Sequence, residues 1–451
     1  MKKTFLAVLS GLVLMSVVAW CIQRDRVKTD KLVLVWVTDD NPTRREQIDT
    51  FNSLHPKYKL RLDPANSDIS KVIVQSIAGV GPDMFDCHNS FELSCFVRAG
   101  IAWDITNELA HAGIDTDKSI WSVTQPFIRH NGRIYGFPAN ATVQGLWFNK
   151  EAFDRQRIPY PEGPWTWEQF LPLAKRLTLR DPNGRVTQYG FFCDTGEWAT
   201  FVYQWGGRIF SEDGTRCVID SPQAVAGIQF MMDLIYKHHV SPSPTEQSAM
   251  ATQGGWGSGI ISQFASQKAA MAMGERWWLC TLRTYKGLRL GAVEAPHGKV
   301  RVFLGAARST VINRRGPRRR ECLDFIRYIS GERFNNLVNN QADALSAVRK
   351  YCYTPEFLRN PEHPEEDYNA VWRDAMKFAV CRDSSPFVDD YTVYRIIELQ
   401  LDLVKNGRKT VAESMIAAAR QIREKMQENL AEDPVLRARY EKLANGSREG
   451  Q

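Results

Sequence analysis

The sequence predicts an α/β fold built on a mostly parallel sheet, and three features near the start of the chain indicate it. Residues 32–37 form the apolar run Leu-Val-Leu-Val-Trp-Val, which is typical of a strand covered on both faces. A short amphipathic helix and a second strand, 58–62, follow. A helix over 72–78 and a third strand starting at Gly81-Pro82-Asp83 complete the pattern. Strands that alternate with helices predict parallel pairing.

Length and composition describe an ordinary soluble protein. The chain has 451 residues, enough for two to three domains, with 43% hydrophobic and 24% charged residues. Its net charge of +7 is modest for this size, and much of the visible basic excess lies in residues 314–320, Arg-Arg-Gly-Pro-Arg-Arg-Arg. No nucleic-acid motif accompanies this run, so we interpret it as a solvated loop before a helix and expect no nucleic-acid partner.

The first residues are expected to direct export and membrane attachment. Lys2-Lys3 precede an apolar run over 5–20, the pattern of a secretory signal. Cys21 ends the run, so the segment resembles a bacterial lipoprotein signal in which this cysteine is lipidated, although Trp20 is larger than the residue such signals place before the cysteine. An uncleaved membrane anchor and ordinary cleavage are the alternatives.

Nine cysteines in an exported chain permit disulfides, but their pairing cannot be read from sequence. Plain buried thiols are our expectation for most of them, and Cys87 and Cys95 are the closest pair. The chain contains neither Cys-x-x-Cys nor His-Glu-x-x-His, so no metal site and no cofactor is expected.

The stretch 127–178 carries the densest local signals. Asn131-Gly132 predicts a tight turn. A short apolar strand over 134–137 is expected to end at Pro138, and 146–148 is expected to form a second, buried strand. Thr166 and Gln169 are spaced as a capping box that begins a helix, with an apolar stripe over 170–177. Pro172 is expected to kink that helix.

Further elements follow from turn and capping signals. Ser221-Pro222 predicts an N-cap with proline in the first helical turn. The chain after Asp433 is polar, and we expect it to fray. The remaining expectations are an aromatic helix over 198–205, a hairpin over 208–219, a loop over 254–259, a strand over 304–313, a helix over 321–330 and a long amphipathic helix over 411–430.

The order of these motifs resembles the family 1 extracellular solute-binding proteins, which are the carbohydrate-binding components of ABC importers. The resemblance covers roughly residues 31–430 and rests on four motifs in order: Asn131-Gly132, Tyr135-Gly136-Phe137-Pro138, Trp147-Phe148-Asn149-Lys150 and Pro164-Trp165-Thr166-Trp167-Glu168. The segment 264–273 also carries the family's phenylalanine, lysine and Ala-Met pattern, which we expect to form a helix.

The resemblance implies a two-lobed periplasmic-binding-protein fold of type II, with a ligand cleft between the lobes. It places residues 31–140 and 296–342 in the first lobe and 141–295 and 343–432 in the second, after a signal or anchor over 1–30 and before a polar tail over 433–451. The chain is expected to cross between lobes near Asn140, near Pro296 and near Ser346.

The resemblance also implies ligand residues, because aromatic rings cover sugar faces while carboxylates and amides bind hydroxyls. Trp36 could equally be core, Asn140 and Thr142 could equally support the hinge, and Trp256, Glu275, Arg308 and Tyr394 match less well. The expected set is Trp36, Asp39, Asp40, Asn89, Ser90 and Arg308 from the first lobe, Asn140 and Thr142 from the crossing, and Trp198, Trp256, Glu275, Trp277, Trp278 and Tyr394 from the second lobe.

These features together favour a monomeric binding protein that closes around a sugar or oligosaccharide and delivers it to the transmembrane subunits of an ABC permease. No catalytic residue is expected. A non-sugar solute such as a polyamine or an organic anion is the main alternative, and it would show charged pairs in place of stacked tryptophans. A secreted carbohydrate hydrolase would need two opposed carboxylates, which nothing in the sequence fixes. A sensor that presents its ligand to a receptor would share the same fold.

Overall fold

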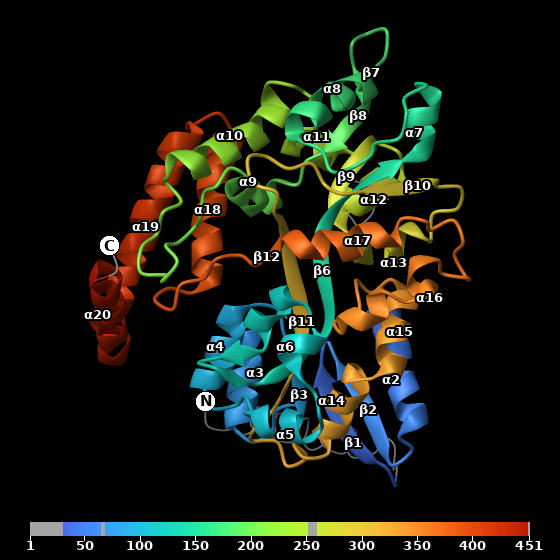
Figure 1. Ribbon diagram of the computed structural model, residues 1–451. Helices are drawn as coiled ribbons and strands as arrows, with labels where there is room; N and C mark the ends of the chain where they lie inside the picture. The colour runs from blue at the N-terminus through green and yellow to red at the C-terminus, as the bar shows by residue number, and fades with distance from the viewer. Residues whose placement is uncertain (1–29, 65–67, 251–258, 450–451) are drawn as a thin grey trace, which may run out of the picture.

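The computed structural model describes residues 30–64, 68–250 and 259–449, and it folds into two α/β lobes joined by long strands (Figure 1). The expected export segment and the 254–258 part of the predicted loop lie outside these residues. The main path of the sheet has the order β2-β1-β3-β11-β6-β9-β8-β7. The α/β class predicted from the sequence is confirmed, and the sheet is mixed.

The first lobe contains the parallel strands predicted at the start of the chain. Strand β1 pairs in parallel with β2 on one side and β3 on the other. Its elements are β1 (Leu32–Val37), α2 (Pro42–Leu54), β2 (Tyr58–Asp63), α3 (Ile69–Ile77), β3 (Met84–Cys87), α4 (Ser90–Arg98), α5 (Thr106–His111), α6 (Thr116–Ser119), the 3₁₀ helix η1 (Ser122–Phe127), the small hairpin β4 (Arg129–His130) and β5 (Arg133–Ile134), α14 (Cys322–Ser330) and α15 (Glu332–Gln341).

Two long strands connect the lobes. Strand β6 (Gly136–Asn149) pairs with β11 (Phe303–Ile312) over residues 136–143 and with β9 over residues 144–148. The lower part of β6 therefore belongs to the sheet of the first lobe and the upper part to that of the second. The return runs along β11, somewhat later than Pro296. A third link is the bridge between Ala141 and Leu345.

Pro138 does not end the strand, so that expectation was wrong. The register between β6 and β11 shifts between Arg308 and Ser309, where Pro138 faces Ser309. A bulge leaves room for a residue that has no N–H to donate, and the strand continues through it as one element of 14 residues.

The second lobe holds the rest of the sheet and most of the helices. Strands β8 and β9 are parallel, while β9 and β10 each run antiparallel to β6. Its elements are α7 (Lys150–Arg155), α8 (Trp167–Leu177), β7 (Leu179–Arg180), β8 (Val186–Phe192), η2 (Thr195–Glu197), α9 (Trp198–Gln204), α10 (Pro222–Tyr236), α11 (Pro244–Ala249), α12 (Ile260–Ala265), β9 (Ala269–Glu275), η3 (Arg276–Trp278), α13 (Leu279–Leu282), β10 (Leu290–Val293), η4 (Arg349–Cys352) and α16 (Pro355–Leu358) at the border, α17 (Asn369–Ala375), η5 (Met376–Phe378), β12 (Ala379–Val380), α18 (Asp390–Lys405), α19 (Val411–Glu432) and α20 (Pro434–Glu449).

Local signals were accurate where short-range chemistry decides the structure. The Thr166 side chain and the Gln169 side chain form the predicted capping box at the start of α8, and the helix continues through Pro172. Ser221 caps α10, which has proline in its first turn. The predicted hairpin is a turn at Gly214 closed by a bridge between Phe210 and Cys217.

Two other expectations were wrong. The Ala-Met run is the buried strand β9, because Ala269 to Gly274 are buried between β6 and β8. The chain after Asp433 is the helix α20, which packs against α19 through a stripe containing Leu436, Tyr440 and Leu443. Figure 1 shows this helix beside the first lobe, at the end of the red helices.

Separate hydrophobic cores stabilise the lobes. One cluster surrounds Trp147, Phe170 and Phe201 in the second lobe, and two clusters lie on the opposite faces of β1 and β3 in the first. The eight cysteines within the described residues are all free thiols, five of them buried, as expected. Within the same residues, the helices are too short or too polar to cross a membrane.

Candidate ligand site between the two lobes

Polar and charged side chains gather where strands of both lobes end near the crossing. In the first lobe β1 and β3 end at Val37 and Cys87, and in the second β8 and β9 end at Phe192 and Glu275. Ligands of open α/β sheets bind outside the carboxyl ends of the strands. A ligand is therefore expected at this end of the strands.

In the first lobe, two guanidinium groups lie among three carboxylates. The Arg44 guanidinium contacts Asp39 at 3.1 Å and Asp343 at 3.0 Å. Arg308 approaches Asp86 at 3.2 Å, Asp343 at 3.5 Å and Asp39 at 3.9 Å. These side chains form one network, which joins segments almost 300 positions apart in sequence. Its carboxylates and Arg308 come from β3, β11, the loop after β1 and the chain after α15.

Electrostatics keep Asp39 ionised. Burial alone would raise its pKa, but Arg44 and Arg308 lower the pKa to about 2. Asp39 is the member of the network with most access to solvent, since 29% of its side chain is exposed. It is therefore the carboxylate best placed to accept hydrogen bonds from a ligand.

Trp36 is a fully buried part of the core below this network. Its indole N–H donates to Asp86 at 2.9 Å, and the guanidiniums of Arg44 and Arg308 lie 5.5 Å and 5.4 Å from its ring centre. The ring contacts Phe325 at 4.9 Å. Both faces are thus used within the protein, which matches the core alternative for this residue.

Two donors of Arg308 form no hydrogen bond within the described residues, although both face carboxylates. Its Nε and Nη2 make no hydrogen bond with the described residues although the residue is only 6% exposed, and the Thr142 hydroxyl on the neighbouring strand is buried without a partner as well. Asn140 is occupied, because its side chain accepts from the Arg308 backbone and donates to the Asp343 carbonyl. Unsatisfied buried donors are costly and rare, and Arg308 Nε and Nη2 have only ion-pair contacts, at 3.9 Å with Asp39 and 3.5 Å with Asp343.

The second lobe contributes a pair of carboxylates. Gln144 on β6 donates to Glu197 at 2.8 Å, and Arg382 contacts the same carboxylate at 3.3 Å. Glu275 lies at the end of β9, opposite Gln144 in the register. Burial and then the nearby Glu197 raise the pKa of Glu275 to about 8, and burial raises the pKa of Glu197 too. One carboxyl of the pair thus holds a proton at neutral pH.

Tyr394 lies beside this pair. The Arg382 guanidinium is 5.1 Å from its ring centre. Burial also raises the pKa of Asp390, to about 7. The neighbouring Asp389 and, from the first lobe, Glu92 contribute to this rise in pKa. Acidic groups therefore outnumber basic groups around Arg382.

Two of the expected stacking tryptophans are packed inside the second lobe. Trp198 is 1% exposed and contacts Tyr394 at 5.7 Å between ring centres. Trp278 is 6% exposed and covers Gly274, where a Cβ would come within 2.4 Å of the indole. Trp277 is only half-buried, against the core. Trp256 lies outside the described residues.

The remaining expected residues lie on the first lobe. Asn89 caps α4, and Ser90 reaches the second lobe, where its hydroxyl lies 3.1 Å from that of Ser384. Asp40 is exposed and pairs with Arg45 at 2.9 Å. Of these three, Ser90 makes the contact that bridges the lobes.

Sequence reasoning missed several charged residues of the site. Asp86 interrupts the otherwise apolar strand β3, and this could have drawn attention to it. Arg44, Glu197, Arg382 and Asp343 had no comparable signal, since each lies in an ordinary polar segment and joins the site only through the fold.

One group of described residues has metal-ligand spacing, but it is already engaged. His363, Glu365 and Glu366 lie close enough to share an ion. Glu366, however, accepts both arms of the Arg283 guanidinium, at 2.7 Å and 2.8 Å. A bidentate ion pair of this kind accounts for the burial of the Glu366 carboxylate, so its position does not require a metal ion.

Comparisons with known proteins agree with this architecture. The family model of bacterial extracellular solute-binding proteins matches residues 36–300. In solved structures, the chain is similar to an ABC substrate-binding protein from Listeria monocytogenes in complex with cycloalternan, with a TM-score of 0.75 and 19% identity over 88% of this chain and 100% of that one. It is also similar to the maltose/maltodextrin-binding domain from Bdellovibrio bacteriovorus bound to maltotriose, with a TM-score of 0.69 and 17% identity over 89% and 100%.

Curated relatives match over shorter stretches. An arabinooligosaccharide-binding protein of Halalkalibacterium halodurans is 27% identical over 111 residues, and an uncharacterised ABC transporter extracellular-binding protein of Pyrococcus horikoshii is 26% identical over 161 residues. These matches cover 25% and 34% of this chain and span 24% and 34% of the relatives.

The molecule thus shares the fold of these solved structures, with a polar site at the strands that join its two lobes. The chain belongs to the bacterial extracellular solute-binding protein family.

Proposed function

We propose that the protein is the substrate-binding component of an ABC importer, which binds a sugar or oligosaccharide between its lobes and delivers it to a membrane permease without changing it. The observation that carries the proposal is the set of donors without a hydrogen bond among the described residues at the crossing strands, in a family whose members bind solutes. They are the Thr142 hydroxyl and Arg308 Nε and Nη2, which have only ion-pair contacts with Asp39 and Asp343. Sugar hydroxyl oxygens are acceptors of the right kind for such donors.

Lobe closure is the mechanism that this arrangement supports. A ligand shifts an open–closed equilibrium only through contacts that are better in the closed state. Asp39 and Arg308 belong to the first lobe and the crossing, whereas Glu275, Trp277 and Tyr394 belong to the second. A ligand that contacts both sets favours closure, and the Ser90–Ser384 contact marks where the lobes meet.

The test is a calorimetric titration of the full chain with mono- and oligosaccharides, combined with small-angle scattering to detect closure. Saturable binding of a sugar, a smaller radius of gyration with that sugar, and recovery of the sugar unchanged are expected. Recovery of a cleaved product would replace the transport proposal by a hydrolase.

A second candidate is a basic solute such as a polyamine or an amino sugar. It is favoured by the surplus of carboxylates around Arg382, which faces both the Glu197–Glu275 pair and Asp390. The same titration should include spermidine and glucosamine. Tighter binding of a cationic compound than of every neutral sugar would favour this candidate.

We further propose that the protein is exported as a monomer and held at the membrane through its first residues. Lipidation at Cys21 and an uncleaved anchor differ in one outcome: Cys21→Ser releases a lipoprotein into the soluble fraction and leaves an anchored protein in the membrane. A parent protein found in the soluble fraction, with a free amino terminus near residues 21–30, would contradict attachment.

A further inference from the structure

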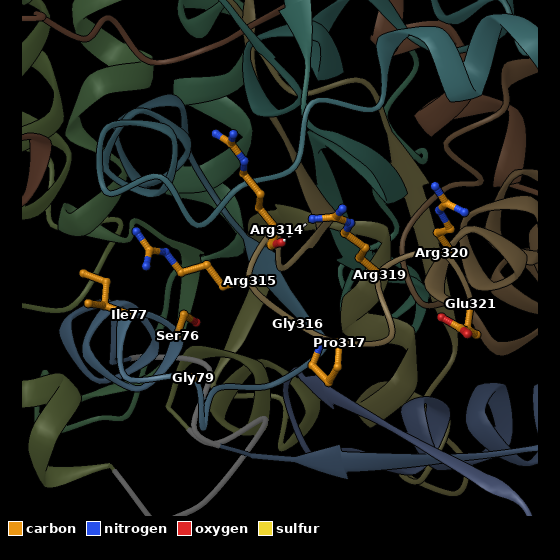
Figure 2. A pocket seen from close by; sticks show the side chains of 10 residues that line it. All are labelled: Ser76, Ile77, Gly79, Arg314, Arg315, Gly316, Pro317, Arg319, Arg320 and Glu321. Atoms are coloured by element: carbon orange, nitrogen blue, oxygen red, sulfur yellow. Dashed lines mark hydrogen bonds between the residues drawn. The ribbon is translucent and has the colours of Figure 1, made fainter.

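A pocket of about 630 Å³ lies on the first lobe, away from the proposed ligand site. It is formed by the loop that follows β11, residues 314–321, and by the end of α3 with Gly79 (Figure 2). Because β11 runs antiparallel to β3, its last residue, Ile312, pairs with Met84 at the beginning of β3. The pocket therefore lies at the amino ends of the first-lobe strands, whereas the proposed ligand site lies at their carboxyl ends.

The pocket wall is strongly basic. Arg314, Arg315, Arg319 and Arg320 line it, against the single carboxylate of Glu321. The carboxyl end of α3 also lines the pocket and adds a partial negative charge of about half a unit. The wall keeps a clear positive excess after both are counted.

Three of these arginines have no acidic partner among the described residues. Arg314, Arg315 and Arg320 are exposed and form no ion pair with them. Arg319 lies 5.6 Å from the Trp103 ring centre and donates to the Arg314 carbonyl at 3.1 Å. Charges that are not paired within the protein are available to an external anion.

The loop that carries them is firmly held. The Asn313 side chain is buried, donates to the Pro82 carbonyl at 2.7 Å and accepts from the Arg315 backbone at 3.0 Å. The Arg314 backbone donates to the Ile101 carbonyl. A backbone fixed in this way presents its guanidiniums in a constant arrangement, which lowers the ordering cost of binding.

Guanidinium groups match phosphate oxygens in a planar, two-pronged geometry. A phosphate group is therefore the anion that this pocket suits best.

The position of the pocket on the fold indicates the source of such a phosphate group. Strand β1 begins at Leu32 on this same edge, where Val35 and Asp83 exchange hydrogen bonds and the Asn313 backbone donates to Asp83. The first residues of the chain, for which we propose membrane attachment, therefore join the fold at the edge that carries the arginines.

We propose that this arginine pocket binds the phosphate group of an anionic phospholipid and holds this edge of the first lobe against the membrane. The inference rests on the proposed membrane attachment and is independent of the solute. Each basic residue near an anionic membrane surface strengthens its attraction. Three unpaired arginines should favour docking on an anionic surface over a neutral one by about a hundredfold.

The experiment uses the full chain in lipid nanodiscs, either of phosphatidylcholine alone or of phosphatidylcholine with phosphatidylglycerol. The readout is hydrogen exchange of the backbone amides in residues 313–321, expressed for each variant as the ratio between anionic and neutral discs. The parent should show strong protection on the anionic discs. The triple variant Arg314→Gln, Arg315→Gln, Arg320→Gln should lose it. The matched control Arg185→Gln, Arg395→Gln, Arg408→Gln removes three exposed arginines of the second lobe and should behave as the parent.

Equal exchange of the parent in the two kinds of disc would overturn the proposal, as would undiminished protection in the triple variant. Protection of the loop by inorganic phosphate but not by anionic discs would assign the pocket to a free anion and overturn the lipid assignment. A chain that leaves neutral discs altogether would refute the attachment and this inference with it. Solute titration of the same variants separates these results from the transport function, because the triple variant should bind its solute as the parent does.

Discussion

Replacing Glu275 by glutamine should change how the stability of the protein depends on pH. Burial and the neighbouring Glu197 raise the pKa of Glu275 from its ordinary 4.5 to about 8. In the unfolded chain the group loses its proton near pH 4.5, but in the folded protein it keeps the proton up to about pH 8. Its contribution to stability is therefore complete below pH 4.5 and is lost as the pH rises through 8.

The magnitude follows from the two pKa values. A difference of this size corresponds to at most about 5 kcal/mol lost between pH 4.5 and pH 8, and the proton shared with Glu197 makes the observed loss smaller. Glutamine keeps the shape of the neutral carboxyl and cannot ionise. The variant Glu275→Gln should match the parent at about pH 5 and exceed its stability by a few kcal/mol at about pH 8.5.

The assay is urea unfolding followed by tryptophan fluorescence, for parent and variant side by side at both pH values. Asp390, whose pKa is also raised to about 7, titrates in the same range. Its effect is common to both proteins and cancels in their difference. Glu365→Gln, at an exposed carboxylate, serves as the control. An equal difference between Glu275→Gln and parent at the two pH values would refute the reasoning.

Four further substitutions test the site and the strand β6 that joins the lobes. Trp277→Ala should weaken solute binding by about tenfold in a titration and leave the fold intact, whereas Trp278→Ala should lower the unfolding free energy by about 3–5 kcal/mol, because that ring is buried. Arg308→Gln should cost about 3–5 kcal/mol of unfolding free energy in urea, because it removes a buried cation that contacts three carboxylates. Gly145→Ala should lower the Tm, at a cost of about 1–3 kcal/mol or more, because its Cβ would lie 2.3 Å from the Trp372 ring.

These predictions have clear controls. Arg45→Gln removes an exposed pair with Asp40 and should change stability by no more than about 1 kcal/mol. A similar small effect at Arg308 would show that its network contributes little. Parent-like binding by Trp277→Ala would remove that ring from the proposed site. An unchanged Tm for Gly145→Ala would show that β6 and Trp372 can move apart without a loss of stability.

The sequence was informative wherever a local pattern has one physical meaning. The apolar run of β1 and the capping box at Thr166 depend on neighbouring residues only, and both were predicted correctly. Pro138 was misjudged because a bulge in the pairing of β6 with β11, a strand about 170 positions away, accommodates it. The Ala-Met run could not be told from a helix by periodicity, since strands buried on both faces carry no alternating pattern.

The site was less predictable than the fold for the same reason. Asp39 and Arg308 were expected as ligand residues, but their partner Asp343 comes from the segment after α15, which the bridge between Ala141 and Leu345 holds near β6. The aromatic residues were chosen as stacking groups, yet Trp36 and Trp198 are needed by the cores. A tryptophan in a loop and a tryptophan in a core look alike in sequence, because burial is decided by tertiary packing.

The interleaving of the two lobes in sequence sets the order in which the chain can fold. Strand β3 ends at Cys87, but its sheet neighbour β11 ends only at Ile312, about 225 residues later. At roughly 5–20 residues per second, synthesis needs roughly 10–45 s to deliver that strand. Until then one edge of the first sheet has no partner, and the first lobe stays incomplete for most of translation. For the export that we propose, this delay extends the period in which the chain stays incompletely folded.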